Sequence, residues 1–374
     1  MLDREMKQSA IHALDNEMLV GGESVFRFED DFAKYIGTDY AVSTNSGSSA
    51  LLLAFYAMGT KNGDNLIAPS ATFIATINGA CLLGAKPLFC EIGADYLIAP
   101  EKLEKLVNKN KVKFVVPVHL YGYPCDMFSI KDIAKKKNAI IIEDAAQAHG
   151  ALYRNKKVGS FGEAAIFSFY PSKNMTVGGD GGMLTTNNKK IYESVMKMRD
   201  VGRKTKYSHD KIGYTLRLNS VNAAIGRVQL RHLDAWNEKR RNVAARYGKK
   251  LKAVGDLILP PTDERNNKSV YHMYVIRTKK RGLLASCLLK KGISTGVHYP
   301  IPVHRQSAYA KYSKGSLPFT DEWSKTVLSI PMYPNLHSRV QEFIINMITK
   351  FYDERLYDNK KIQAEARSWS RKLI

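Results

Sequence analysis

Short apolar runs alternate with amphipathic stretches along most of the first 200 residues. The apolar runs have the length of strands and lie at residues 40–44, 65–70, 86–92, 113–122, 139–144 and 164–169. Helical patterns lie between many of them, at residues 50–59, 71–84, 100–110 and 129–138. This alternation predicts an α/β domain with a mostly parallel sheet.

The pattern changes after residue 187. We expect a helix at residues 189–200 and a polar loop at residues 201–220. A long helix then runs from about residue 221 into the 240s, beginning apolar and ending strongly basic. Basic residues in the last turns suit the helix dipole, so this helix is expected to lead from the core to the surface.

We place a domain boundary near Gly255, between a large domain (1–254) and a small C-terminal α+β domain (255–374). The small domain is expected to contain strands near 272–278, a helix at 283–292, and proline-rich loops at 296–304 and 329–335. The basic tail, residues 358–374, is expected to be either helical or frayed.

Polar residues follow several of the predicted strands. They are Asn45, Ser70, His119, Asp144 and Ser168. Ligands of open α/β sheets bind beyond the carboxyl ends of the strands. We therefore expect these five side chains to converge on one site.

The 374-residue chain carries a formal net charge of +22. Such a charge attracts polyanions, and either nucleic acid or phosphorylated and nucleotide-linked small molecules would satisfy it. The basic residues are spread widely without a basic–aromatic stripe, so we expect no nucleic-acid site. A lysine bias throughout the host would give the same charge without any function.

The remaining composition is that of an ordinary globular protein. No apolar run approaches a membrane span, and the N-terminal residues lack the apolar segment of a signal peptide. The four cysteines are scattered, with no CxxC motif and no spacing typical of metal ligands. We expect a cytoplasmic protein with buried thiols, no metal and no membrane contact.

Two residues suggest covalent chemistry. Lys173 lies in the turn FYPSKNM, between an apolar run and a glycine cluster. In a partly desolvated pocket its amine would have a lowered pKa and could attack a carbonyl; a solvent-facing turn lysine is the alternative. Asp144 ends the run IIIED, where a buried carboxylate is costly unless it is paired or well hydrogen-bonded. A protonated pyridine nitrogen would be a suitable partner.

Pyridoxal phosphate requires a lysine, an acid at the ring nitrogen, phosphate donors and a stacking side chain. Lys173 and Asp144 would supply the first two. The turn before residue 50 leads into a helix whose free amides suit a phosphate, although serine N-capping alone would also explain it. The other candidates are Gly47, Ser48, Ser49 and Ser168 for the phosphate, Phe73 for stacking and Gln147 for the ring hydroxyl.

Many ordered motifs resemble one known family. They are GGESVFRFEDDFA, STNSGSSAL, PSATFIATINGA, VPVHLYGYPCDM, IIEDAAQAHGA, FSFYPSKN with GDGGM, GYTLRL with NAAIGRVQL, HYPIPVH and SIPMYPNL. Between about residues 21 and 336 the chain resembles the pyridoxal-phosphate-dependent sugar aminotransferases of the DegT/DnrJ/EryC/StrS type. A series of ordered motifs is far more specific than any one of them.

This resemblance implies fold type I, with a large, mostly parallel seven-stranded sheet domain and a smaller C-terminal α+β domain. Lys173 would be the internal aldimine lysine and proton shuttle, and Asp144 would hold the pyridinium charge. The family works as a homodimer with its active site at the interface, where the loop containing Thr215 would reach the neighbour's phosphate. Members commonly have asparagine at this position. Thr215 is shorter but can still donate one hydrogen bond.

The implied reaction transfers an amino group from glutamate or glutamine to a nucleotide-linked 3-keto or 4-keto deoxyhexose, in a ping-pong scheme through pyridoxamine phosphate. Candidate substrate contacts are Arg203, Lys204, Lys206 and Tyr207 for the diphosphate, and His298, Tyr299 and His304 for the sugar. Solvated loop charges and structural histidines are the alternatives to these contacts.

Two other functions remain open. One branch of the family replaces the lysine with histidine and removes a hydroxyl from the sugar, and the presence of Lys173 argues against that dehydratase chemistry. The other alternative is a non-enzymatic, basic protein that keeps the cofactor fold and acts as a nucleic-acid-binding or regulatory protein.

Overall fold

The computed structural model describes residues 2–262, 266–313 and 315–358, with residues 360, 362, 363 and 366. Within these residues the largest sheet has seven strands in the order β1-β9-β8-β5-β4-β2-β3. They are β1 (Tyr40–Thr44), β2 (Asn65–Pro69), β3 (Lys86–Cys90), β4 (Phe114–Val115), β5 (Ile140–Asp144), β8 (Ala164–Ser168) and β9 (Gly182–Thr186). Of these, β9 alone runs opposite to the other strands, and it pairs antiparallel with β8 and β1. The predicted mostly parallel sheet is confirmed.

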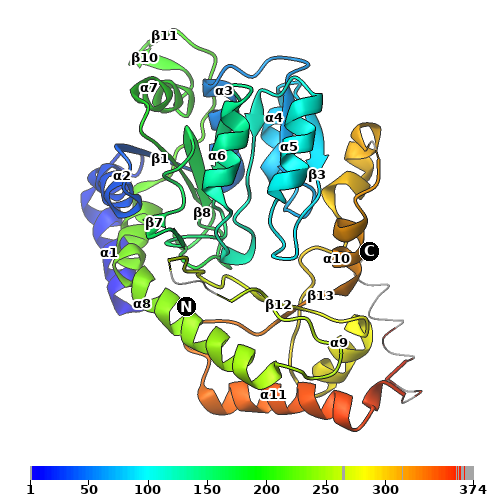
Figure 1. Ribbon diagram of the computed structural model, residues 1–374. Helices are drawn as coiled ribbons and strands as arrows, with labels where there is room; N and C mark the ends of the chain where they lie inside the picture. Colours follow the sequence, from blue (N-terminus) through cyan, green and yellow to red (C-terminus); the bar gives the residue numbers. More distant parts are fainter. Residues whose placement is uncertain are drawn as a thin grey trace.

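Helices cover both faces of this sheet (Figure 1). Those on one face are α3 (Gly47–Ala57), α4 (Ala75–Leu82) and α7 (Lys189–Met198), and those on the other are α2 (Glu23–Ile36), α5 (Pro100–Lys109) and α6 (Met127–Lys135). Successive strand residues point to opposite faces, so β2 places Ile67 in one buried cluster and Leu66 in the other. The continuous apolar runs in the sequence reflect this burial on both faces.

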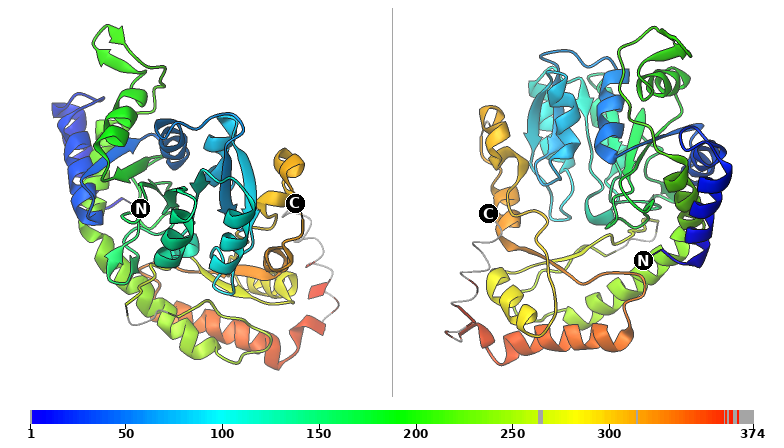
Figure 2. Two further views of the ribbon diagram at one scale, coloured as in Figure 1. Left: turned by 45° about the horizontal axis from the view of Figure 1, so that its top comes forward. Right: turned by 180° about the vertical axis from the view of Figure 1, so that it is seen from behind.

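A long helix, α8 (Ser220–Leu251), connects the sheet to the C-terminal part of the chain (Figures 1 and 2). Its first half packs against α1 (Arg4–Asn16), and it also contacts α11 (Ser338–Asp353). The remaining C-terminal elements are β12 (Tyr274–Arg277), α9 (Arg281–Lys290), α10 (Pro318–Thr326) and β13 (Val327–Ile330), with β12 antiparallel to β13. The exact domain boundary near Gly255 stays a prediction.

Three segments differ from the sequence-based expectation. The polar loop at 201–220 contains a hairpin of β10 (Arg203–Thr205) and β11 (Ser208–His209). The loop expected at 329–335 begins inside β13, because the apolar run ends only at the proline that follows Ile330. The strand expected at 113–122 is regular only in β4, after which a turn with a left-handed Tyr121 (φ 58°) takes the chain away from the sheet.

Short elements complete the description. They are the hairpin β6 (Leu152–Tyr153) and β7 (Lys156–Lys157), and the 3₁₀ turns Leu120–Gly122, Val303–Arg305, Ser307–Tyr312 and Leu356–Asp358. Among the residues described, no helix has both the length and the apolar character needed to cross a membrane. Most of the basic tail lies outside the described residues.

A buried ion pair fixes β1 between α2 and the end of α7. The guanidinium of Arg199 donates hydrogen bonds to the carboxylate of Glu29 and to the carbonyl of Ser43 (2.7 Å). The amide and hydroxyl of Ser43 also donate to Glu29, at 2.8 and 2.6 Å. Only 7% of the Arg199 side chain and 6% of the Glu29 side chain are exposed. The pair therefore ties the sheet edge to both helices.

We predict that Arg199→Met destabilises the fold by about 3–5 kcal/mol, because it leaves the Glu29 carboxylate buried without its cation. The matched control is Arg27→Met, which removes an exposed arginine paired with Glu23 and should change the stability by less than about 0.5 kcal/mol. Urea unfolding of both variants measures the difference. Equal stabilities would contradict the structural importance of the buried pair.

Candidate active site

The carboxyl ends of the parallel strands border a cavity of about 470 Å³. It is lined by the turns after β2, β5 and β8, the start of α3 and two C-terminal loops. Of the residues predicted from sequence, it brings together Gly47, Ser48, Phe73, Asp144, Gln147, Ser168, Lys173, His298 and Tyr299. These residues come from five separate segments and meet at the edge of the sheet where ligands were expected.

Lys173 lies in the turn after β8, where its backbone amide donates to the carbonyl of Tyr170 (2.8 Å). Within the described chain no residue accepts a hydrogen bond from its Nζ. Burial lowers the pKa of Lys173 to about 8, and the charge of Asp144 offsets this only in part. About a tenth of the amine would then be neutral at pH 7, far more than for an exposed lysine.

Asp144 ends β5 and is 5% exposed. Its Oδ2 accepts a hydrogen bond from the hydroxyl of Thr76 (2.7 Å), and its Oδ1 accepts one from the amide of Ala146 (3.1 Å). Burial raises the pKa of Asp144, while the Thr76 hydroxyl, the Ala146 amide and the charge of Lys173 oppose that rise. The carboxylate is therefore oriented by neutral donors but has no cation in direct contact among the described residues.

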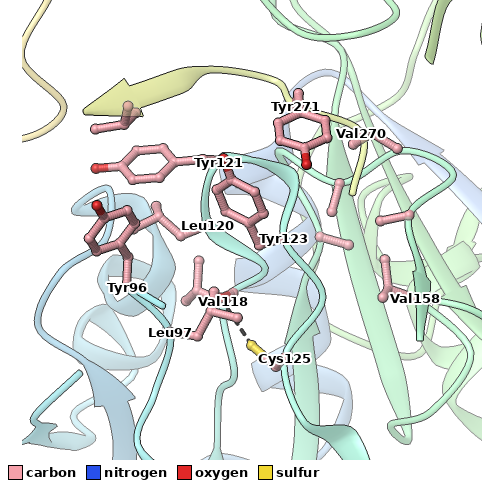
Figure 3. Packing of buried hydrophobic residues seen from close by; sticks show 14 of the residues in the cluster. Tyr96, Leu97, Val118, Leu120, Tyr121, Tyr123, Cys125, Val158, Val270 and Tyr271 are labelled. Atoms are coloured by element: carbon pink, nitrogen blue, oxygen red, sulfur yellow. Dashed lines mark hydrogen bonds between the residues drawn. The ribbon is translucent and has the colours of Figure 1, made fainter. Parts of the chain in front are cut away.

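Gln147 is held in one orientation by the turn that contains Tyr121. The backbone amide of Tyr121 donates to Gln147 Oε1 (2.7 Å), so the Nε2 group is the donor, and it reaches the hydroxyl of Tyr299 at 3.2 Å. Tyr121 is itself fully buried, between Tyr96 and Tyr123 (Figure 3), and its hydroxyl donates to the carbonyl of His298. Tyr121 thus connects two walls of the cavity.

The start of α3 forms the polar end of the cavity. Ser46 is the N-cap and accepts a hydrogen bond from the amide of Ser49 (3.1 Å). Gly47 is required because a β-carbon there would lie 2.8 Å from the Cβ of Ser168. This close approach brings the Ser168 side chain to the helix N-terminus, where amides and hydroxyls can hold an anion.

A second buried acid, Glu143, anchors β5 from the opposite face. Its carboxylate accepts hydrogen bonds from the amides of Gly159, Phe161 and Gly162 (2.7–2.8 Å) and lies 3.1 Å from His119 Nε2. Burial alone would raise the pKa of Glu143, but His119 and these amides hold it below the ordinary value. Glu143 therefore fixes the strand end that carries Asp144.

Three of the five residues expected to converge do not line the cavity. His119 faces Glu143, as described above. The Asn45 side chain accepts a hydrogen bond from the hydroxyl of Ser49 (2.6 Å), so Ser49 belongs to the helix cap rather than to the cavity lining. Ser70 pairs with His304 at 2.6 Å. These residues lie at strand ends, but their side chains point to neighbouring structure.

Two groups of candidate substrate residues also lie outside the cavity of their own chain. His304 is 2% exposed, with Nδ1 against Ser70 and Nε2 3.1 Å from Asp321, so its ring fastens a loop. The candidates Arg203, Lys204, Lys206 and Tyr207 lie on or beside the β10–β11 hairpin, which projects from the body (Figure 2), and Thr215 is exposed in the following loop.

Sequence patterns alone did not identify several lining or supporting residues. Thr76 lies one helical turn after Thr72, in the same motif as Phe73. Its hydroxyl is hydrogen-bonded to that of Thr72 and donates to Asp144. Tyr121 is hydrogen-bonded to Gln147 and His272 to Asn174, so the role of each depends on how distant segments pack together. In the sequence, these residues are marked only by lying in or beside segments that contain both polar and aromatic residues.

The cavity fits pyridoxal phosphate. The group carries a phosphate, an aldehyde and a basic ring nitrogen, and the cavity offers a helix N-terminus with serines, a buried amine and a buried carboxylate. The raised pKa of Asp144 and the lowered pKa of Lys173 both indicate charges without full compensation. A cationic ring nitrogen at Asp144 and a covalent bond to Lys173 would supply what each lacks.

Comparisons with known proteins agree with this chemistry. Residues 1–349 match the DegT/DnrJ/EryC1/StrS aminotransferase family. A pleiotropic regulatory protein of Geobacillus stearothermophilus is 40% identical, over 93% of this chain and 95% of its own. The dTDP-3-amino-3,4,6-trideoxy-alpha-D-glucose transaminase of Streptomyces venezuelae is 39% identical, over 90% of this chain and 89% of its own.

A solved structure shares the fold as well. DesV of S. venezuelae, crystallised with a ketimine intermediate, superimposes with a TM-score of 0.90 and 38% identity, over 93% of this chain and 94% of its own. The expected fold type and cofactor are thereby confirmed. The chain belongs to the DegT/DnrJ/EryC1/StrS aminotransferase family and is an aminotransferase that uses pyridoxal phosphate.

Proposed function

We propose that this enzyme transfers an amino group from glutamate or glutamine to a nucleotide-linked keto-deoxyhexose, in two half-reactions that share one cavity. The observation that carries the proposal is the partly buried amine of Lys173, with its lowered pKa, in the same cavity as the buried carboxylate of Asp144. The substrate class is supported by the name of the S. venezuelae relative, a transaminase of a dTDP-linked amino sugar.

In this scheme Lys173 is both the attachment point of the cofactor and the group that moves the proton. When bound, pyridoxal phosphate supplies an electron sink for the carbanion formed at the substrate carbon. Lys173 takes the proton from the α-carbon of the amino donor and delivers it to the C4′ carbon of the cofactor. A pKa of about 8 suits this task, because the amine can both accept and release a proton near neutral pH.

Other side chains would orient the cofactor. Asp144, held by Thr76 and Ala146, would stabilise the protonated ring nitrogen. Gln147 would donate to the ring hydroxyl, and Phe73, half-exposed above the cavity, would stack on the ring. Ser48, Ser168 and the amides at the start of α3 would hold the phosphate.

The sugar would enter beside the aromatic pair of Phe73 and Tyr299, next to His298. The rings of Phe73 and Tyr299 lie 5.8 Å apart, and both residues line the cavity. Burial and the charge of Lys173 lower the pKa of His298, so this ring is neutral and can exchange hydrogen bonds with hydroxyls. His304 is given no substrate contact, because its ring fastens a loop.

We further propose that the enzyme is a homodimer and that each site is completed by the partner subunit. Thr215 and the β10–β11 hairpin are exposed and do not line the cavity of their own chain. A neighbouring copy could place its Thr215 hydroxyl at the phosphate and its Arg203, Lys206 and Tyr207 near the diphosphate. Retention of Lys173 favours transamination over the related dehydratase reaction.

We predict that Lys173→Ala binds pyridoxal phosphate without the covalent attachment that borohydride traps, and lowers amino transfer about 10²–10⁴-fold. The readouts are the visible spectrum and mass spectrometry of the product from glutamate and a panel of nucleotide-linked keto sugars. The control is Lys190→Ala, which replaces an exposed lysine. Full activity of Lys173→Ala would refute the proposed function.

The pH dependence of cofactor attachment gives a second prediction. Only the neutral amine attacks the aldehyde, so the rate at which the cofactor-free protein acquires covalently bound cofactor should rise through the Lys173 pKa of about 8 and then level off. Stopped-flow absorbance from about pH 6 to about pH 10 measures it. A rate that still rises above about pH 10 would indicate an ordinary, solvated lysine.

Thr215 tests the contact across the dimer. Thr215→Ala should weaken pyridoxal phosphate binding about 3- to 10-fold, as expected for the loss of one hydrogen bond. Thr215→Asn should strengthen it, because the longer amide reaches further. Equilibrium titration of the cofactor-free protein, with sedimentation to confirm the dimer, gives the answer. Unchanged affinity in both variants would exclude the contact.

A further inference from the structure

A chain of buried amides determines the hydrogen-bonding state of His272. The Nδ2 group of Asn237 donates to the carbonyl of His149 (2.8 Å), so Asn237 Oδ1 is an acceptor. Asn174 Nδ2 donates to that oxygen and to the carbonyl of Val270, both at 2.9 Å. Flipping either amide would place two oxygens in contact. The Oδ1 of Asn174 must therefore face the remaining partner, His272 Nδ1, at 3.2 Å.

This arrangement fixes the tautomer of His272. Because Asn174 Oδ1 accepts, the ring proton lies on Nδ1 and the lone pair lies on Nε2. His272 is 4% exposed and lines the cavity, and its Nε2 has no partner among the described residues. Burial holds the pKa of His272 well below the ordinary value, and nearby cations add to this, so the ring stays neutral. The cavity thus contains a buried acceptor without a donor.

The same cavity contains a donor without an acceptor. Lys173 precedes Asn174 in sequence, and its Nζ has no acceptor in the described chain. The titratable groups that interact with it are Asp144 after β5, His149 in the following turn, His272 before β12 and His298 before β13. All three imidazoles are neutral, because burial and the Lys173 charge lower each of their pKa values.

We propose that His272 is a positioning residue that accepts, at Nε2, a hydrogen bond from Nζ of Lys173 once pyridoxamine phosphate fills the cavity; without the cofactor the two atoms are not hydrogen-bonded. The bond would hold the protonated lysine inside the cavity between the two proton transfers. Asn174 would act through His272, by keeping the lone pair on Nε2. This inference rests on the proposed role of Lys173 as the reacting amine.

The test measures the pKa of Lys173 itself. The full-length protein, loaded with pyridoxamine phosphate so that Lys173 is free, is labelled with trace acetic anhydride across a pH series, and mass spectrometry follows the peptide containing Lys173. An acceptor for the ammonium group raises the pKa of a lysine. His272→Leu should therefore lower the pKa of Lys173 by about one, a tenfold change in the ratio of charged to neutral amine. His272→Gln, which retains an acceptor, should stay near the wild type.

His149→Leu is the matched control. His149 is fully buried near Lys173, but it does not line the cavity. Its replacement should leave the pKa of Lys173 unchanged. Equal shifts in the two leucine variants, or no shift in His272→Leu, would overturn the proposal.

A second measurement requires no substitution. Nitrogen NMR of histidine-labelled wild-type protein should show His272 with a bare Nε2, and a proton on Nε2 would overturn the inference. Neither negative result would affect the proposed function, which depends on covalent attachment at Lys173 and is lost only if Lys173→Ala remains active.

Discussion

The active site depends on two oppositely charged side chains, Asp144 and Lys173, that are removed from water in the same cavity. Asp144 and Lys173 end or follow neighbouring strands, β5 and β8, so the sheet itself sets their relation. Burial raises the pKa of the acid and lowers that of the amine, and neither charge fully compensates the other. Such a pair is costly in an empty pocket. A ligand with a cationic nitrogen and an aldehyde removes this cost, because the nitrogen pairs with the carboxylate and the aldehyde bonds to the amine.

The surrounding protein makes that cost tolerable by fixing the strand end. Alternation along β5 turns Asp144 toward the cavity and Glu143 toward the opposite side, where three backbone amides and His119 satisfy the second carboxylate. The pKa of Glu143 is lowered while that of its neighbour is raised. The two adjacent acids thus have different roles. All the hydrogen bonds to Glu143 come from the protein, whereas Asp144 can still accept a hydrogen bond from a ligand.

Local patterns account for the part of the site that the sequence could predict. Asp144, Lys173 and the serines at the start of α3 follow apolar runs, and strand ends can be recognised from such runs alone. Thr76, Tyr121 and His272 could not be found in this way, since each acts on a residue at least 26 positions away or through a buried network. His304 is the converse case, in which the structural alternative holds. A histidine in a proline-rich loop near the cavity is paired with Ser70 and Asp321 instead.

The open side of the cavity follows from the same physical logic. Phe73 is 53% exposed although it lines the cavity, and Thr215 is exposed without lining the cavity of its own chain. A ring that stacks on a cofactor buries only one of its faces, so covering the other face would add further apolar burial and dispersion contacts. Closure by a second copy would bury Phe73 and bring a donor to the phosphate in one step. On the proposed dimer, assembly and completion of the site would therefore be a single event, and dilution of the dimer should weaken cofactor binding in parallel.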